Sequence, residues 1–249
     1  MTVLPDGVTV ADELPHPGGG AEEWIFAAWA PDARSAVISG HRLLPVVAGA
    51  RRRAWYWAAY ALADGPLFHV TEFDIDVRAD PFIVKAEALW AEHTCDAPWE
   101  QWTIGNETYA AALDDVEEGL GRAYGLPTPI AFDLEWYATG PPAPVRDDAG
   151  SRHSYEQPGV VHGVVEIAGR PTDEFVEAPA HRWRRWVDRE SPAAAPVEPT
   201  SGESAMVGLG PIALPTGRAH TGVRVPFVLP DGTVFDWVLT TRGWCSRRR

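Results

Sequence analysis

Short runs of apolar, β-branched and aromatic residues recur between turn residues along most of the chain, and this pattern restricts the fold more than any other feature. The chain contains 23 glycines and 23 prolines, which are spread along its length and leave little room for long helices. The runs include 22–30, 35–44, 53–62 and 66–77, and their composition is typical of β-strands. We therefore expect an all-β fold.

Later segments continue this pattern. Residues 128–140, "TPIAFDLEWYATG", alternate between apolar and polar positions and predict a strand with one polar face. The exception is residues 114–127, where a capping residue and apolar residues at helical spacing predict one short helix. Four more β segments are predicted: 81–94, 99–113, 156–169 and 173–188. A Pro-Asp-Gly turn at 230–232 predicts a closing β-hairpin over 223–244.

A segment rich in proline, glycine and charge, residues 141–153, has no periodicity and is predicted to be a linker. It divides the chain into an N-terminal β-barrel-like domain, 1–140, and a C-terminal one, 154–249. The low-complexity segment 190–204 inside the second unit is predicted to be a mobile loop.

The chain has a formal net charge of −14, which argues against nucleic acid as a partner because the protein's own field repels phosphates. Its only cysteines, Cys95 and Cys245, are too few for a disulfide framework and suggest a cytoplasmic protein. The longest apolar run, 54–63, is far shorter than a membrane span, and the first residues do not resemble a signal peptide. We expect a soluble protein without stable membrane insertion.

Three residues are candidates for acid–base catalysis. Asp133 and Glu135 share one face of their predicted strand, so both could project into a barrel, although a solvent-facing pair is the more ordinary interpretation. His162 shares strand parity with flanking valines, where a core histidine is as natural as a catalytic one.

Neither a metal nor an organic cofactor is expected. His93 and Cys95 would lie on one strand face, but a zinc site needs three or four converging ligands and the sequence offers no second cluster at matching spacing. The chain also has no nucleophile elbow, no phosphate-binding glycine loop and no dinucleotide fingerprint.

The order of motifs resembles a known superfamily. A Glu23-Trp24 pair opens the first strands, a glycine-led strand of the form Y-E-Q-P-G-x-V-x-G-x-V-E-I-x-G covers 155–169, and an Arg/Trp-rich segment, "APAHRWRRW", covers 178–186. This is similar to the lipocalin-like superfamily of hydroxyneurosporene synthase, a carotenoid hydratase, and AttH-type proteins, and more remotely to tocopherol cyclase.

The resemblance implies two lipocalin-like, calycin-type antiparallel β-barrel or sandwich domains that hold an apolar small molecule of isoprenoid, steroid or polyketide type. It implies either a cofactor-independent hydratase (a lyase) or a cyclase or isomerase. The alternative is a non-catalytic carrier or a structural interaction protein with the same fold. The candidate ligand-binding residues are Trp24, Trp102, Trp136, Arg182, Trp183 and Trp186. The arginines of the Arg/Trp-rich segment are expected to stack on rings or to pair with carboxylates such as Asp173, Glu174 or Glu177.

Overall fold

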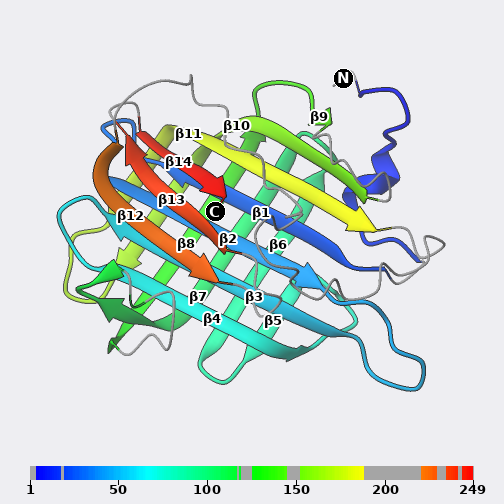
Figure 1. The fold of residues 1–249 in the computed structure, drawn as a ribbon, viewed down its shortest axis with the longest axis horizontal. Helices are drawn as coiled ribbons and strands as arrows, with labels where there is room; N and C mark the ends of the chain where they lie inside the picture. Colours follow the sequence, from blue (N-terminus) through cyan, green and yellow to red (C-terminus); the bar gives the residue numbers. More distant parts are fainter. Residues whose placement is uncertain are drawn as a thin grey trace, which may run out of the picture.

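The protein, as a computed structural model, is almost entirely built of antiparallel β-strands (Figure 1), which confirms the predicted all-β class. The structure describes residues 4–17, 20–116, 118, 125–144, 152–187, 220–228, 234–240 and 243–248. The predicted helix at 114–127 falls largely outside these residues, and the predicted loop at 190–204 falls entirely outside them. Among the described residues, no helix has both the length and the apolar character needed to cross a membrane.

Eleven strands form one large sheet. Its strands are Glu22–Trp29 (β1), Ser35–Leu43 (β2), Arg53–Leu62 (β3), Leu67–Asp76 (β4), Ile83–Ala86 (β5), Leu89–Ala97 (β6), Gln101–Leu113 (β7), Leu126–Ala138 (β8), Ala143–Pro144 (β9), Arg152–Ile167 (β10) and Asp173–Val187 (β11). The segment predicted as one strand over 81–94 is a hairpin instead, because the chain turns at Ala88, whose φ is +55°.

The large sheet closes on itself. The order β4-β3-β2-β1-β11-β10-β8-β7 returns to β4, because residues 67–69 of β4 pair with residues 111–113 of β7. The strands β5 and β6 extend from β7, and β9 pairs with the start of β10. A closed sheet has an inner and an outer face, and alternate residues of each strand belong to one or the other.

The predicted division into units 1–140 and 154–249 is not the one that the strands follow. Strands β10 and β11, which belong to the predicted second unit, lie between β8 and β1 in the closed sheet. Residues 141–153 are therefore a connection within one sheet, although their composition resembles a linker, and their middle part lies outside the described residues.

The predicted C-terminal hairpin is confirmed, and it forms part of a second, three-stranded sheet. His220–Val228 (β12) pairs with Val234–Thr240 (β13), which pairs with Gly243–Arg248 (β14). Figure 1 shows these strands, in orange and red, in front of β1 and β2. The buried Trp237 of β13 packs in one apolar cluster with Trp57 and Trp183, so the small sheet covers part of the outer face of the large one.

The main core fills the inside of the closed sheet. On β1, Trp24 and Phe26 belong to this inner cluster, whereas Ile25 and Ala27 belong to the outer cluster beneath the small sheet. The inner cluster draws side chains from every strand of the closed path, and most of its large members are aromatic. Since fully buried aromatic side chains carry much of the apolar area, this inner cluster supplies a large share of the fold's stability.

Candidate functional site inside the closed sheet

Five polar residues lie at inward positions of four strands, within the apolar core. Ser39 and His41 come from β2, Tyr56 from β3, His93 from β6 and Asn106 from β7. Each has at most 2% of its surface exposed. Each strand places them inward for the same reason: their neighbours two positions away, such as Val37, Ala91 or Ile104, are apolar core residues. We call these five residues the inner polar cluster.

Four members of the inner polar cluster form a chain of hydrogen bonds across the interior. Asn106 Nδ2 donates to the Tyr56 hydroxyl at 2.8 Å. The Tyr56 hydroxyl lies 3.2 Å from Ser39 Oγ, and Ser39 Oγ lies 2.7 Å from His93 Nε2. This chain connects β7, β3, β2 and β6, so it joins strands that do not all neighbour one another in the sheet.

Several buried polar atoms have no hydrogen-bond partner within the described part of the chain. Those that lie in this interior are both ring nitrogens of His41, Nδ1 of His93, Oδ1 of Asn106 and the indole nitrogens of Trp102 and Trp136. An unsatisfied buried polar group costs about 1–3 kcal/mol, and folded proteins contain few of them. Such a concentration in one interior is therefore a feature of a site that receives a polar group from another molecule.

Aromatic side chains surround the two histidines. The His41 ring stacks on Trp24 with centroids 6.0 Å apart, and its distance to the His93 ring is also 6.0 Å. Phe26 meets His93 edge-on at 5.1 Å, and Phe82 lies 6.4 Å from His41. The site thus combines polar atoms with apolar walls, which is typical of sites for small organic molecules.

Burial keeps both histidines neutral. Desolvation, with a smaller contribution from the charge of Arg52, lowers the pKa of His41 to about 3. Desolvation, followed by the proximity of His41, holds the pKa of His93 well below its ordinary value. A neutral imidazole has one N–H group and one unprotonated nitrogen, so at neutral pH each ring can donate one hydrogen bond and accept another. Desolvation also raises the pKa of the Tyr56 hydroxyl, so this group remains protonated.

The N-terminal segment closes one end of the interior. Its 3-10 helix, Val10–Glu13 (η1), brings the fully buried Glu13 carboxylate against the Arg182 guanidinium, and Nη1 of Arg182 donates to it at 2.7 Å. Glu13 also accepts from the backbone N–H of Trp99 at 2.9 Å, and its carbonyl accepts from the indole of Trp24 at 2.9 Å. Arg182 lies over three indole rings, with its nearest ring, that of Trp136, at 4.8 Å.

Two neighbouring arginines of β11 form similar pairs. Arg184 donates to Glu22 at 2.6 Å and lies 4.1 Å from the centre of the Trp24 ring. Arg185, on the opposite face of β11, pairs with Glu23, which also accepts from Arg42 at 3.0 Å. The prediction of arginines stacked on rings is thus confirmed for Arg182 and Arg184, but the predicted acidic partners were wrong. Asp173 accepts from Tyr60 instead, and Glu174 and Glu177 are exposed.

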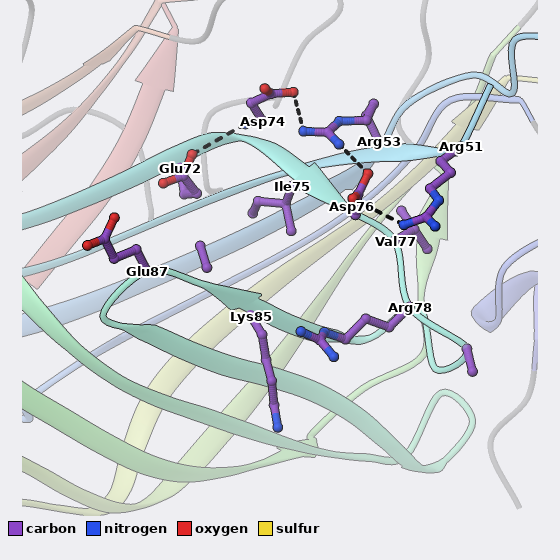
Figure 2. A pocket seen from close by; sticks show the side chains of 12 residues that line it. Arg51, Arg53, Glu72, Asp74, Ile75, Asp76, Val77, Arg78, Lys85 and Glu87 are labelled. Atoms are coloured by element: carbon purple, nitrogen blue, oxygen red, sulfur yellow. Dashed lines mark hydrogen bonds and ion pairs between the residues drawn. The ribbon is translucent and has the colours of Figure 1, made fainter.

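Two surface grooves reach residues of the inner cluster. The first, of about 660 Å³, lies between β4 and β5 and is drawn in Figure 2. Its rim is charged, with Arg53 bound to Asp74 and Asp76, and its lining includes the buried Ile75. The second groove has a volume of about 790 Å³ and lies toward the end of the strands that is opposite to Glu13. Three inner residues line it: Leu89, Ile130 and Ile167.

The three predicted catalytic residues do not belong to the inner polar cluster. Asp133 and Glu135 are exposed, because β8 turns its apolar positions inward, and Glu135 accepts from the Tyr137 hydroxyl at 2.7 Å. His162 is half-buried on the outside and lies 3.0 Å from the exposed Glu177. The expectation that the two carboxylates project into the barrel is therefore corrected.

The predicted ligand-binding residues divide among three places. Trp24, Trp102 and Trp136 lie in the inner cluster, and Arg182 lies at its closed end. Trp183 instead packs on the outer face beneath the small sheet. Trp186 stacks on Tyr155 with ring centres 5.5 Å apart, in a small cluster near the N-terminal segment. The structure brings together only the first four.

The sequence analysis did not identify His41, Tyr56 or Asn106 as site residues, and it considered His93 only as a metal ligand. The signal was one or two polar residues in an otherwise apolar inward run on each of several strands, as in Val37-x-Ser39-x-His41. Among the described residues, no group of three or more histidine, cysteine or acidic side chains is arranged to hold a metal ion.

The chain belongs to the DUF7064 family, a domain of unknown function, which it matches over residues 9–234. No curated protein matches it. Among solved structures it is similar to an AttH protein from Nitrosomonas europaea, with 14% identity and a TM-score of 0.48 over 98% of this chain and 69% of that one. It is also similar to kievitone hydratase from Nectria haematococca, with 9% identity and a TM-score of 0.44 over 98% and 70% of the two chains. CghA with Sch210972 matches at 14% identity and a TM-score of 0.36 over 68% and 46%.

Proposed function

We propose that this protein binds an apolar small molecule of isoprenoid, steroid or polyketide type inside the closed sheet and transfers protons on it. The observation that carries this proposal is His41, a 1% exposed histidine whose two ring nitrogens have no partner among the described residues. A buried imidazole without partners costs stability, so a functional role is its most natural explanation.

The reaction class that fits is hydration, dehydration or cyclisation without redox change. In a hydration, one carbon of an alkene gains a proton while the neighbouring carbon gains the hydroxyl group of water, whose other proton passes to a base. His41 and His93 are suited to such transfers because a neutral imidazole can take a proton from water, and the imidazolium that results can give that proton to the substrate carbon. The indole rings of Trp24, Trp102 and Trp136 favour developing positive charge on the substrate.

The grooves give a route to this site. The groove lined by Leu89, Ile130 and Ile167 has a volume suited to a small organic molecule, and these three residues belong to the inner cluster. A ligand that enters there first meets these apolar side chains. Burial of apolar area at about 25 cal/mol per Å² can then supply micromolar affinity.

The test begins with the compound that copurifies with the protein, identified by mass spectrometry after organic extraction. This compound is then incubated with wild-type protein, with His41→Phe and with the exposed control variant Glu135→Gln. We expect conversion by the wild type and the control, and binding without conversion by His41→Phe. If the wild type retains its ligand unchanged, the protein is a carrier, and if Glu135→Gln alone loses conversion, the site lies on the outer face.

A further inference from the structure

We infer that His93 presents an Nδ1–H donor to its ligand, and that the ligand is a neutral oxygenated molecule, a ketone or an alcohol, and not a carboxylate. This inference rests on the proposed function, because it names the class of substrate for the same site. It follows from counting the protons of the inner polar cluster and then the charges around it.

The proton count fixes the direction of the hydrogen-bond chain. Tyr56 OH accepts from Asn106 Nδ2, and its own proton needs an acceptor because the side chain is fully buried. Its other neighbour is Ser39 Oγ, 3.2 Å away. Because Asn106 already donates to the Tyr56 oxygen, we infer that the Tyr56 proton points to Ser39 Oγ. The Ser39 proton is then free for His93 Nε2 at 2.7 Å, which must be the unprotonated ring nitrogen.

The reverse direction leaves more groups unsatisfied. If His93 Nε2–H donated to Ser39 and Ser39 donated to Tyr56, the Tyr56 proton would have no acceptor in the described interior. Both directions leave His93 Nδ1 without a protein partner. The two directions differ in what Nδ1 offers to a ligand. In the favoured direction, Nδ1 carries a proton and acts as a hydrogen-bond donor.

The charges around the cluster select a neutral ligand. The fully buried arginines on the inner face of β11, within the described residues, are Arg182 and Arg184, and each is paired with a buried carboxylate, Glu13 and Glu22. Arg52, whose charge reaches His41, also lies beside a carboxylate, 3.5 Å from Glu22. A carboxylate on the ligand would thus enter the interior without a cation that lacks a carboxylate partner, which is costly in an apolar environment. Desolvation keeps the pKa of His93 well below neutrality, so this ring does not supply a positive charge.

The second histidine, His41, offers further hydrogen bonds to the ligand's polar group. His41 has one donor and one acceptor nitrogen, both without partners among the described residues, and its ring lies 6.0 Å from that of His93. A carbonyl oxygen can accept from both rings, and a hydroxyl group can accept from His93 and donate to His41. Hydrocarbons satisfy neither ring.

The experiment uses four probes with one ring system: acetylnaphthalene, naphthol, naphthoate and naphthalene, titrated by quenching of tryptophan fluorescence. We expect acetylnaphthalene and naphthol to bind roughly tenfold more tightly than naphthalene, and naphthoate to bind more weakly than both. His93→Phe should remove the advantage that acetylnaphthalene has over naphthalene. Equal affinity for naphthoate and acetylnaphthalene would overturn the inference, whereas absence of binding by all four, naphthalene included, would instead overturn the proposed function.

A second measurement does not depend on any ligand. Nitrogen NMR of protein labelled in its histidine rings reports which ring nitrogen carries the proton, and the His93 signals are identified by their loss in His93→Phe. We expect the Nδ1–H form in the wild type and a shift toward a mixture of forms in Tyr56→Phe, because this variant lacks the proton that sets the direction. An Nε2–H form in the wild type contradicts the inference and leaves the proposed function standing.

Discussion

The guanidinium of Arg182 forms a buried ion pair with the carboxylate of Glu13, a residue 169 positions earlier in the chain. The side chains are 1% and 0% exposed, respectively. Removing one partner of such a pair leaves an uncompensated charge in an apolar place. The pair also ties the N-terminal segment to β11, so its loss should affect the closed end of the sheet first.

Glu13→Gln should lower the free energy of unfolding by about 3–5 kcal/mol, because it leaves the Arg182 charge buried without its carboxylate. Chemical denaturation measures this change. Asp64→Asn is the matched control, since it breaks the Arg34–Asp64 pair, whose side chains are 71% and 82% exposed. The control should change stability by less than about 1 kcal/mol. Similar small losses for both variants would show that Arg182 finds another partner.

Trp183→Ala should lower stability by about 3–5 kcal/mol, as truncations of large buried aromatic residues do. Trp183 is 1% exposed and packs with Trp57 and with Trp237 of the small sheet. Thermal melting compares it with Val176→Ala, a variant of an exposed residue on the same strand. A Trp183→Ala protein that melts like the wild type but no longer binds ligand would contradict the architectural role and place the residue in the site.

His41→Phe should leave stability unchanged or raise it by about 1 kcal/mol, because the new ring keeps the stack on Trp24 and removes two buried nitrogens without partners. His93→Phe should instead lower stability, since it breaks the bond to Ser39. Denaturation curves of the two variants distinguish these outcomes. A large loss of stability in His41→Phe would mean that His41 has a structural role, and would contradict the functional role proposed for it.

Stability should decrease as the pH falls below about 6.5, in part because His41 must remain neutral in the folded protein. Its pKa is about 3 in the folded state against an ordinary value of 6.5, so the unfolded chain binds more protons between these values. The folded state therefore gains stability as pH rises through this window and loses it as pH falls. Urea denaturation at about pH 7 and about pH 5 should show a steeper loss for wild type than for His41→Phe. Parallel losses in the two proteins would refute this role of His41.

Gly159→Ala should destabilise the protein by about 1–3 kcal/mol, because a Cβ atom there would lie 2.3 Å from Cε2 of the Trp136 indole. Phenylalanine has a smaller ring system than tryptophan, without the Nε1 and Cζ2 atoms that also lie near this Cβ. The double variant Gly159→Ala/Trp136→Phe should thus be more stable than the sum of the two single effects predicts. Additive losses in a double-mutant cycle would mean that the strand moves to accommodate the methyl group.

The sequence predicted strands well where the alternation was regular. The segment of β8 was recognised because apolar residues recur at every second position. The segment of β3 was recognised because it is a run of apolar and aromatic residues between turn residues. Alternation gives the two faces of a strand but not which one turns inward, and for this reason Asp133 and Glu135 were considered as interior residues. The turn between β5 and β6 was missed because Ala88 carries no turn signal, although it adopts a positive φ.

The site itself was largely beyond local patterns. Glu13, the partner of Arg182, lies in a segment that has no apolar periodicity. No spacing within the sequence relates the two residues. The same holds for His41 and His93, which come from strands far apart in the chain and meet only because the sheet closes. Such contacts depend on the topology, which short-range propensities do not determine.

The position of β1 between β2 and β11 also has a kinetic consequence. The first strand of the sheet cannot complete its pairing until the last strand of that sheet has been synthesised, because residues 22–28 pair with residues 180–186. Loop closure over such a distance is slow, and a partly made chain exposes the unpaired edge of β1 with its apolar side chains. We expect nascent chains that end before β11 to aggregate or to require a chaperone, so that the yield of folded protein depends on the rate of translation through the β11 segment.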